Sequence, residues 1–145
     1  MKRRDRAVSY FDEGFSCAQA VLATFAPQFG LTTEQAMRVA GSFGSGMAGR
    51  GQTCGAVTGA MMVIGLQEGK TRGDDDAARD QCYAVVDAFV TRFEGRHGSI
   101  VCRELLGCDI STPEGMAHAR ENNLFDERCT TFVRDAADIL TTLLE

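Results

Sequence analysis

Helical signals cover most of this chain, and strand signals are nearly absent. The clearest stretch runs from about Asp74 to Phe93, where apolar residues recur three or four positions apart, the spacing of one helix face. Capping patterns at Ser16 and Thr32, each with Gln three residues later, open two further helices. Helices are expected over about 3–12, 17–25, 32–43, 54–68, 74–93, 113–122 and 127–144, with a short turn at 102–106. The sequence therefore predicts an all-α fold, a compact single-domain bundle of about six to seven helices.

Length, charge and hydropathy limit the number of domains, the kinds of partner and the location of the protein. A chain of 145 residues without a linker suits one domain over residues 1–145, and a net charge of −5 argues against nucleic acid as a partner. The longest apolar stretch, about Ala56 to Leu66, is shorter than the ~20 residues that cross a bilayer, so no membrane insertion is expected. The basic cluster at residues 2–4 has no apolar segment behind it and does not read as a signal peptide. We therefore expect a soluble, cytoplasmic protein.

Six cysteines in such a protein argue against a structural disulfide framework, because cytosolic thiols stay reduced unless they are catalytic, sensing or metal-bound. Four of them are predicted in the first turn of a helix, where unpaired N–H groups and the helix dipole favour a thiolate. No pair has Cys-x-x-Cys spacing, which excludes a thioredoxin-type dithiol, a c-type haem site and a local zinc knuckle. We expect these four to converge at one end of the bundle, with at least two close enough to bridge: Cys17, Cys54, Cys102 and Cys129.

The remaining cysteines and both histidines have simpler interpretations. Cys82 lies within an apolar helix stripe and is expected in the core. Cys108 follows a helix-ending glycine, so it is either an exposed spectator or a resolving thiol. His97 and His118 are expected to be partly exposed spectators. Cys129 also lies on an apolar stripe, so core packing is an alternative for it too.

A glycine-rich loop spans residues 44–51 and contains a literal Gly-x-Gly-x-x-Gly. A dinucleotide site needs a strand before that motif, and here a helix precedes it, so we reject a Rossmann site. The loop is expected either to fold around the start of the Cys54 helix as a cradle for an anion or cluster, or to serve as a plain connection. Arg50 lies four residues before Cys54 in the sequence, and a nearby cation would lower the pKa of that thiol.

The segments that hold the four cysteines resemble the C_GCAxxG_C_C family, which is named for its cysteine motif and described as redox-active. The resemblance extends along essentially the whole chain. It implies that the four helix-start cysteines are those of the family, that Gly55 and Gly59 complete the central motif, and that the other two cysteines are additional. The pieces that carry it are Gly14–Leu22 (GFSCAQAVL), Cys54–Ala60 (CGAVTGA), Ile100–Gly107 (IVCRELLG) and Cys129.

Gly55 and Gly59 leave a nearly bare helix face beside Cys54. Another helix, a cluster or a partner thiol can approach such a face closely. Together with Arg50, these glycines are the residues expected around a bound cofactor. The same face is compatible with a homodimer.

Three functions remain open on the sequence. In the first, the protein is a cytoplasmic thiol–disulfide oxidoreductase or redox sensor, with Cys54 as attacking thiolate and Cys17 or Cys102 as resolving thiol. Its partner would be an unidentified redox protein or small thiol. In the second, the four cysteines ligate one iron–sulfur cluster or a zinc ion. In the third, the cysteines fill the core of a non-catalytic interaction domain. The first two need the same converging thiols, so the sequence does not separate them.

Overall fold

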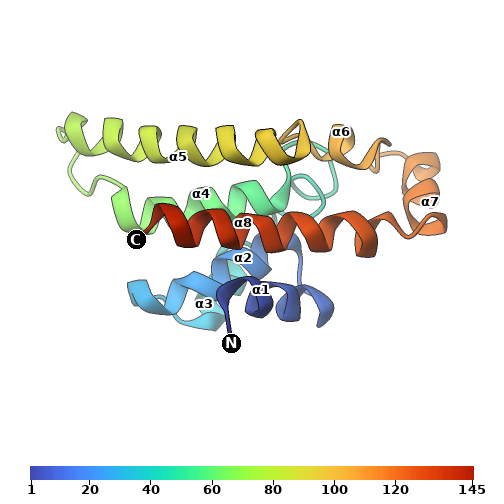
Figure 1. The fold of residues 1–145 in the computed structure, drawn as a ribbon, viewed down its shortest axis with the longest axis horizontal. Helices are drawn as coiled ribbons and strands as arrows, with labels where there is room; N and C mark the ends of the chain where they lie inside the picture. Colours follow the sequence, from blue (N-terminus) through green and yellow to red (C-terminus); the bar gives the residue numbers. More distant parts are fainter.

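A computed structural model describes residues 1–145 and confirms the all-α fold (Figure 1). It has eight α-helices, one more than the upper end of the expected range, because the segment predicted as a short turn forms the five-residue helix α6. A 3₁₀ turn at Ala26–Phe29 follows α2, and a π-helical turn at Phe125–Cys129 leads into α8. The helices are α1 (Arg3–Asp12), α2 (Cys17–Phe25), α3 (Thr33–Val39), α4 (Gly55–Glu68), α5 (Asp76–His97), α6 (Cys102–Leu106), α7 (Pro113–Glu121) and α8 (Thr130–Leu143).

Local capping explains where the helices begin. The Ser16 hydroxyl accepts a hydrogen bond from the Gln19 backbone N–H at 3.3 Å, while the Gln19 side chain accepts one from the Ser16 N–H at 3.0 Å. Thr32 and Gln35 form the same box before α3. These reciprocal bonds satisfy two of the N–H groups that a helix start leaves without partners, so both starts could be predicted within one residue.

The helix ends were predicted less well. Helix α5 continues to His97, four residues beyond the predicted end, and terminates at Gly98 in the left-handed conformation, with φ of 84°. Helix α3 ends at Val39, four residues before the predicted Phe43, because Gly41 is a poor helix former.

Three groups of helices pack around one core. In Figure 1, α5 lies along the top, α4 and α8 cross the middle, and α1 to α3 lie below. Helix α4 contacts α2, α5 and α8, and α8 also contacts α1 and α5. Thirty-one buried apolar residues form a single cluster, in which the largest fully buried side chains are Phe25, Phe89 and Phe93. None of the helices is both long and apolar enough to cross a membrane.

The contact between α2 and α4 depends on missing side chains. A Cβ atom at Gly59 would lie 2.8 Å from the backbone oxygen of Ala18 and 3.2 Å from its Cα. One at Gly55 would lie 2.9 Å from the Ala18 nitrogen and 3.1 Å from the Cβ of Cys17. The bare helix face is therefore covered by α2 of the same chain, which leaves it unavailable as a dimer interface.

Gly59→Ala should lower the free energy of unfolding by about 1–3 kcal/mol, because the added methyl group meets backbone that cannot rotate away. Gly65→Ala is the matched control on the same helix, where an added Cβ meets nothing within 4 Å. This control should be neutral or stabilising by about 0.5–1 kcal/mol. Urea unfolding curves with unchanged slopes measure both effects. Equal effects of the two substitutions would contradict the close α2–α4 contact.

Candidate functional site

The four helix-start cysteines line one cavity of about 70 Å³. Cys17 is the first residue of α2, and Cys54 is the N-cap of α4. Cys102 is the first residue of α6, and Cys129 ends the π-helical turn before α8. Four segments that are distant in the sequence thus place their thiols in the wall of the same cavity. The rest of this wall is mostly apolar, formed chiefly by Phe11, Leu105, Leu106, Phe125 and Phe132.

Backbone pairing ties the Cys54 segment to the Cys102 segment. Thr53 and Val101 form an isolated antiparallel bridge. Beside it, the Cys54 N–H donates to the carbonyl of Ile100 at 2.7 Å, and the Cys102 N–H donates to the carbonyl of Gln52. The start of α4 and the start of α6 are therefore held side by side by main-chain hydrogen bonds, independently of the thiols themselves.

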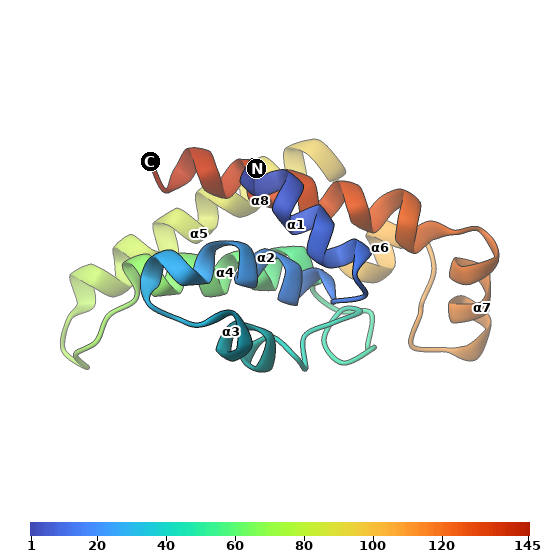
Figure 2. The ribbon, with the colours of Figure 1, turned by 90° about the horizontal axis from the view of Figure 1, so that it is seen from below.

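The glycine-rich loop covers this junction (Figures 1 and 2). Ser45 and Gly46 line the cavity, and a Cβ at Gly46 would lie 2.8 Å from the Cβ of Cys102. Residues 45–49 all have positive φ, including Ser45 (52°), Met47 (70°) and Ala48 (54°). Such a run costs about 1–2 kcal/mol for each non-glycine residue, so surrounding contacts must impose it.

Two residues predicted beside a cofactor lie elsewhere. Arg50 is exposed and does not line the cavity, because the loop turns its backbone toward Cys102 at Gly46 instead. Gly59 lies against α2, away from the cavity wall, whereas Gly55 does contribute to the wall. Only Gly55 of the three therefore stands at the site.

The arginines next to the cysteines bind backbone carbonyls. Arg128 Nη1 donates to the carbonyl oxygens of Leu105 at 3.1 Å and Leu106 at 3.0 Å, which caps the end of α6. Arg103 Nε donates to the carbonyl of Gly51 at 3.2 Å. These bonds fix α6 and the glycine loop in place, so the two guanidinium groups position the site.

For two of the thiols, burial has a larger effect on the pKa than the helix-start N–H groups do. It raises the pKa of Cys54 to about 12, although the N–H groups of Ala56 and Val57 act in the opposite direction. It likewise raises the pKa of Cys102 to about 12, with only a small opposing contribution from the Arg103 cation. Cys54 therefore lacks the lowered pKa that was expected of the attacking thiolate, because taking its charge out of water outweighs the helix dipole.

Cys17 and Cys129 behave as a pair with opposite shifts. The hydrogen bond between their side chains is the largest cause of both: it raises the pKa of Cys17 and lowers that of Cys129. Burial adds to the increase at Cys17, and the Asp126 carboxylate partly opposes the decrease at Cys129. The proton of the pair is therefore favoured on Cys17, and the pKa of Cys129 is the one that is lowered.

The other two cysteines lie outside the cavity wall. Cys82 is half-buried against the core on α5, which agrees with a packing role. Cys108 is also half-buried, and it lies close enough to Cys102 to contribute to the raised pKa of that thiol. All six cysteines are free thiols.

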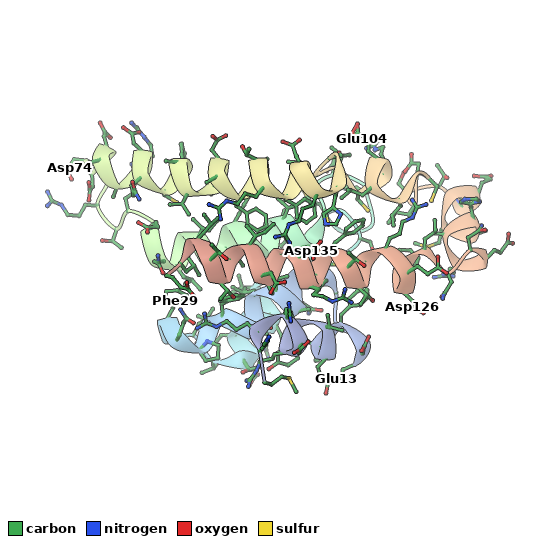
Figure 3. All side chains as sticks on the ribbon, in the orientation of Figure 1. Glu13, Phe29, Asp74, Glu104, Asp126 and Asp135 are labelled. Atoms are coloured by element: carbon green, nitrogen blue, oxygen red, sulfur yellow. The ribbon has the colours of Figure 1, made fainter.

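Neither histidine reaches the cavity. His118 is exposed on α7, as expected. His97 is largely buried instead, with its ring against Phe93 at 4.7 Å and Phe132 at 4.9 Å. Its Nε2 lies 2.8 Å from a carboxylate oxygen of Asp135, which comes from α8 (Figure 3), although the pair lacks the alignment of a hydrogen bond. Phe132 separates this ring from the thiols and is a wall residue that the sequence analysis missed, as are Phe11 and Phe125.

The arrangement of the thiols does not fit a metal ion. Four cysteines are the usual donor set of a structural zinc or iron–sulfur site. Yet no group of three or more His, Cys, Asp or Glu side chains is placed to hold a metal ion in this structure. The thiols surround a void with a mostly apolar wall.

Comparison with known proteins gives one match. The model of a family described as "Putative redox-active protein (C_GCAxxG_C_C)" matches residues 15–143, a range that includes every cysteine of the chain. No curated protein and no solved structure matches.

The opposite pKa shifts of Cys17 and Cys129 can be tested by titration. Because the pKa of Cys129 is lowered from 9.0, its thiolate should form at a lower pH than that of an ordinary cysteine. Cys17→Ala removes the hydrogen bond and should therefore raise the pKa of Cys129. The ultraviolet absorbance of thiolate, followed against pH in each variant and in Cys129→Ser, isolates this group. Cys82→Ala is the control, and an unchanged titration in Cys17→Ala would contradict the pairing.

Proposed function

The chain belongs to the C_GCAxxG_C_C family, and from that premise we propose that it is a thiol-redox protein whose working pair is Cys17 and Cys129. The observation that supports this choice is that both residues line one cavity, where the interaction between their thiols lowers the pKa of Cys129 and raises that of Cys17. A thiolate beside a protonated thiol is the arrangement from which a disulfide forms, since the thiolate is the nucleophile.

In this proposal the two residues have different roles. Cys129 meets the oxidant as thiolate, and Cys17 then gives up its proton and attacks the oxidised Cys129 sulfur. The oxidant takes two electrons when it oxidises Cys129, the attack of Cys17 closes the disulfide, and a reduced thiol reverses the oxidation by exchange. Cys54 and Cys102, whose pKa values lie near 12, stay protonated and form part of the surrounding wall.

The two rival functions have less support. Zinc or cluster binding needs at least three donors placed around one ion, and although four thiols line the cavity, no three side chains have that placement. Cysteines that only fill a core would not need to line one cavity, and Cys82, which packs against the core outside this cavity, illustrates the simpler behaviour. We place the protein in the cytoplasm because six free thiols suit a reducing compartment.

Mild oxidation of the reduced, folded protein with diamide should produce one intramolecular disulfide between Cys17 and Cys129, identified by mass mapping of peptides under non-reducing conditions. Cys129→Ser and Cys17→Ser should each abolish it. Cys82→Ser should leave it unchanged, since this thiol lies outside the cavity wall. A disulfide that forms instead between Cys54 and Cys102, and persists in both serine variants, would overturn the assignment.

A further inference from the structure

We propose that the oxidant of this site is a small uncharged hydroperoxide, with hydrogen peroxide as the simplest case, and not the disulfide of a protein or of glutathione. The inference rests on the proposed function, because it names what oxidises the Cys17–Cys129 pair. Three properties of the cavity support it: its size, its lack of cationic side chains and the polar groups that it does contain.

Size and access limit what can reach the thiols. Cys54, Cys102 and Cys129 are only 4%, 7% and 7% exposed, and Cys17 is half-buried. A disulfide must bring one of its sulfurs into line with the attacking thiolate, together with the chain attached to it. The cavity of about 70 Å³ has room for a molecule of a few heavy atoms, which hydrogen peroxide satisfies and a peptide does not.

Charge excludes anionic disulfides. No lysine, arginine or histidine lines the cavity. Arg103 and Arg128 are turned to backbone carbonyls, and Arg50 is exposed away from the wall. Glutathione disulfide carries several carboxylates, which would lose their hydration here without gaining a partner. A neutral hydroperoxide carries no such penalty.

The polar groups in the wall suit a small hydroxylic molecule. Ser16 and Ser45 both line the cavity. The Ser16 oxygen accepts the Gln19 N–H as a helix cap, and its own proton remains available for a peroxide oxygen. The Cys17 thiol, which lines the same cavity as Cys129, supplies the second proton donor.

The reaction balances with these groups. The Cys129 thiolate attacks one oxygen of hydrogen peroxide, the O–O bond breaks, and Cys129 becomes a sulfenic acid. The departing hydroxide takes the Cys17 proton and leaves as water. The resulting Cys17 thiolate attacks the Cys129 sulfur and expels hydroxide, which closes the disulfide. Two sulfurs are oxidised, the two peroxide oxygens are reduced, and one water and one hydroxide are released.

The test compares two oxidants on the same reduced protein. Hydrogen peroxide should form the Cys17–Cys129 disulfide faster than glutathione disulfide does by at least about two orders of magnitude, because access as well as thiolate fraction sets the rate. In urea the cavity is lost, and this preference should largely disappear. Rates are followed by acid quenching and mass mapping of the disulfide.

A variant of the cavity wall tests whether access to the thiols, and not their reactivity, limits the rate with glutathione disulfide. Phe125 is a half-buried wall residue, so Phe125→Ala should widen the site and reduce the ratio of the hydrogen peroxide rate to the glutathione disulfide rate at least tenfold. Phe29→Ala is the matched control, since Phe29 lies in the 3₁₀ turn away from the cavity (Figure 3). Phe11→Ala provides a second opening if the first variant does not fold.

The outcomes are distinguishable. Equal native rates for the two oxidants, with the Cys17–Cys129 disulfide as product, would overturn the hydroperoxide inference and leave the proposed function standing. Failure of this disulfide to form with hydrogen peroxide, glutathione disulfide and diamide alike would overturn both.

Discussion

Gly55 and Gly59 of α4 let the backbone of α2 approach more closely than any larger residue would permit. The contact at Gly55 and Gly59 places the first turn of α2 directly beside the first residue of α4, and Cys17 thereby reaches the cavity shared with Cys54. Main-chain pairing at Thr53 and Val101 then adds α6. The hydrogen bonds of Arg128 join α6 to the turn that holds Cys129. The thiols are thus positioned by backbone contacts.

The pKa of a cavity thiol depends on two opposing effects. Helix-start N–H groups favour the thiolate, and the loss of water on burial disfavours it. At Cys54 burial wins by a wide margin, since the pKa rises to about 12 despite two favourable amide contacts. The outcome changes only where a second thiol replaces water as hydrogen-bond donor, as Cys17 does for Cys129. In an apolar cavity one thiolate can be accommodated when a neighbouring proton stabilises it, whereas several thiolates would repel one another.

Features that depend on adjacent residues could be predicted from the sequence. The capping boxes at Ser16 and Thr32 gave the starts of α2 and α3, and the spacing of apolar residues gave α5 and α8. The gathering of four cysteines followed from their helix-start positions. The direction of their pKa shifts did not, because burial is a property of the assembled core. The aromatic wall and the exposed position of Arg50 likewise depend on contacts between segments distant in the sequence.

The glycine-rich loop adopts the left-handed backbone conformation that L-amino acids disfavour, with positive φ at every residue from Ser45 to Gly49. A turn of that hand has little stability on its own. Its restraints are the packing of Gly46 on Cys102 and of Gly44 on Ser16, both of which require α2 and α6 to be in place already. The loop is therefore expected to be the last part of the site to form during folding, after the helices that it covers have docked. The cavity would acquire its final wall only once the rest of the native structure exists.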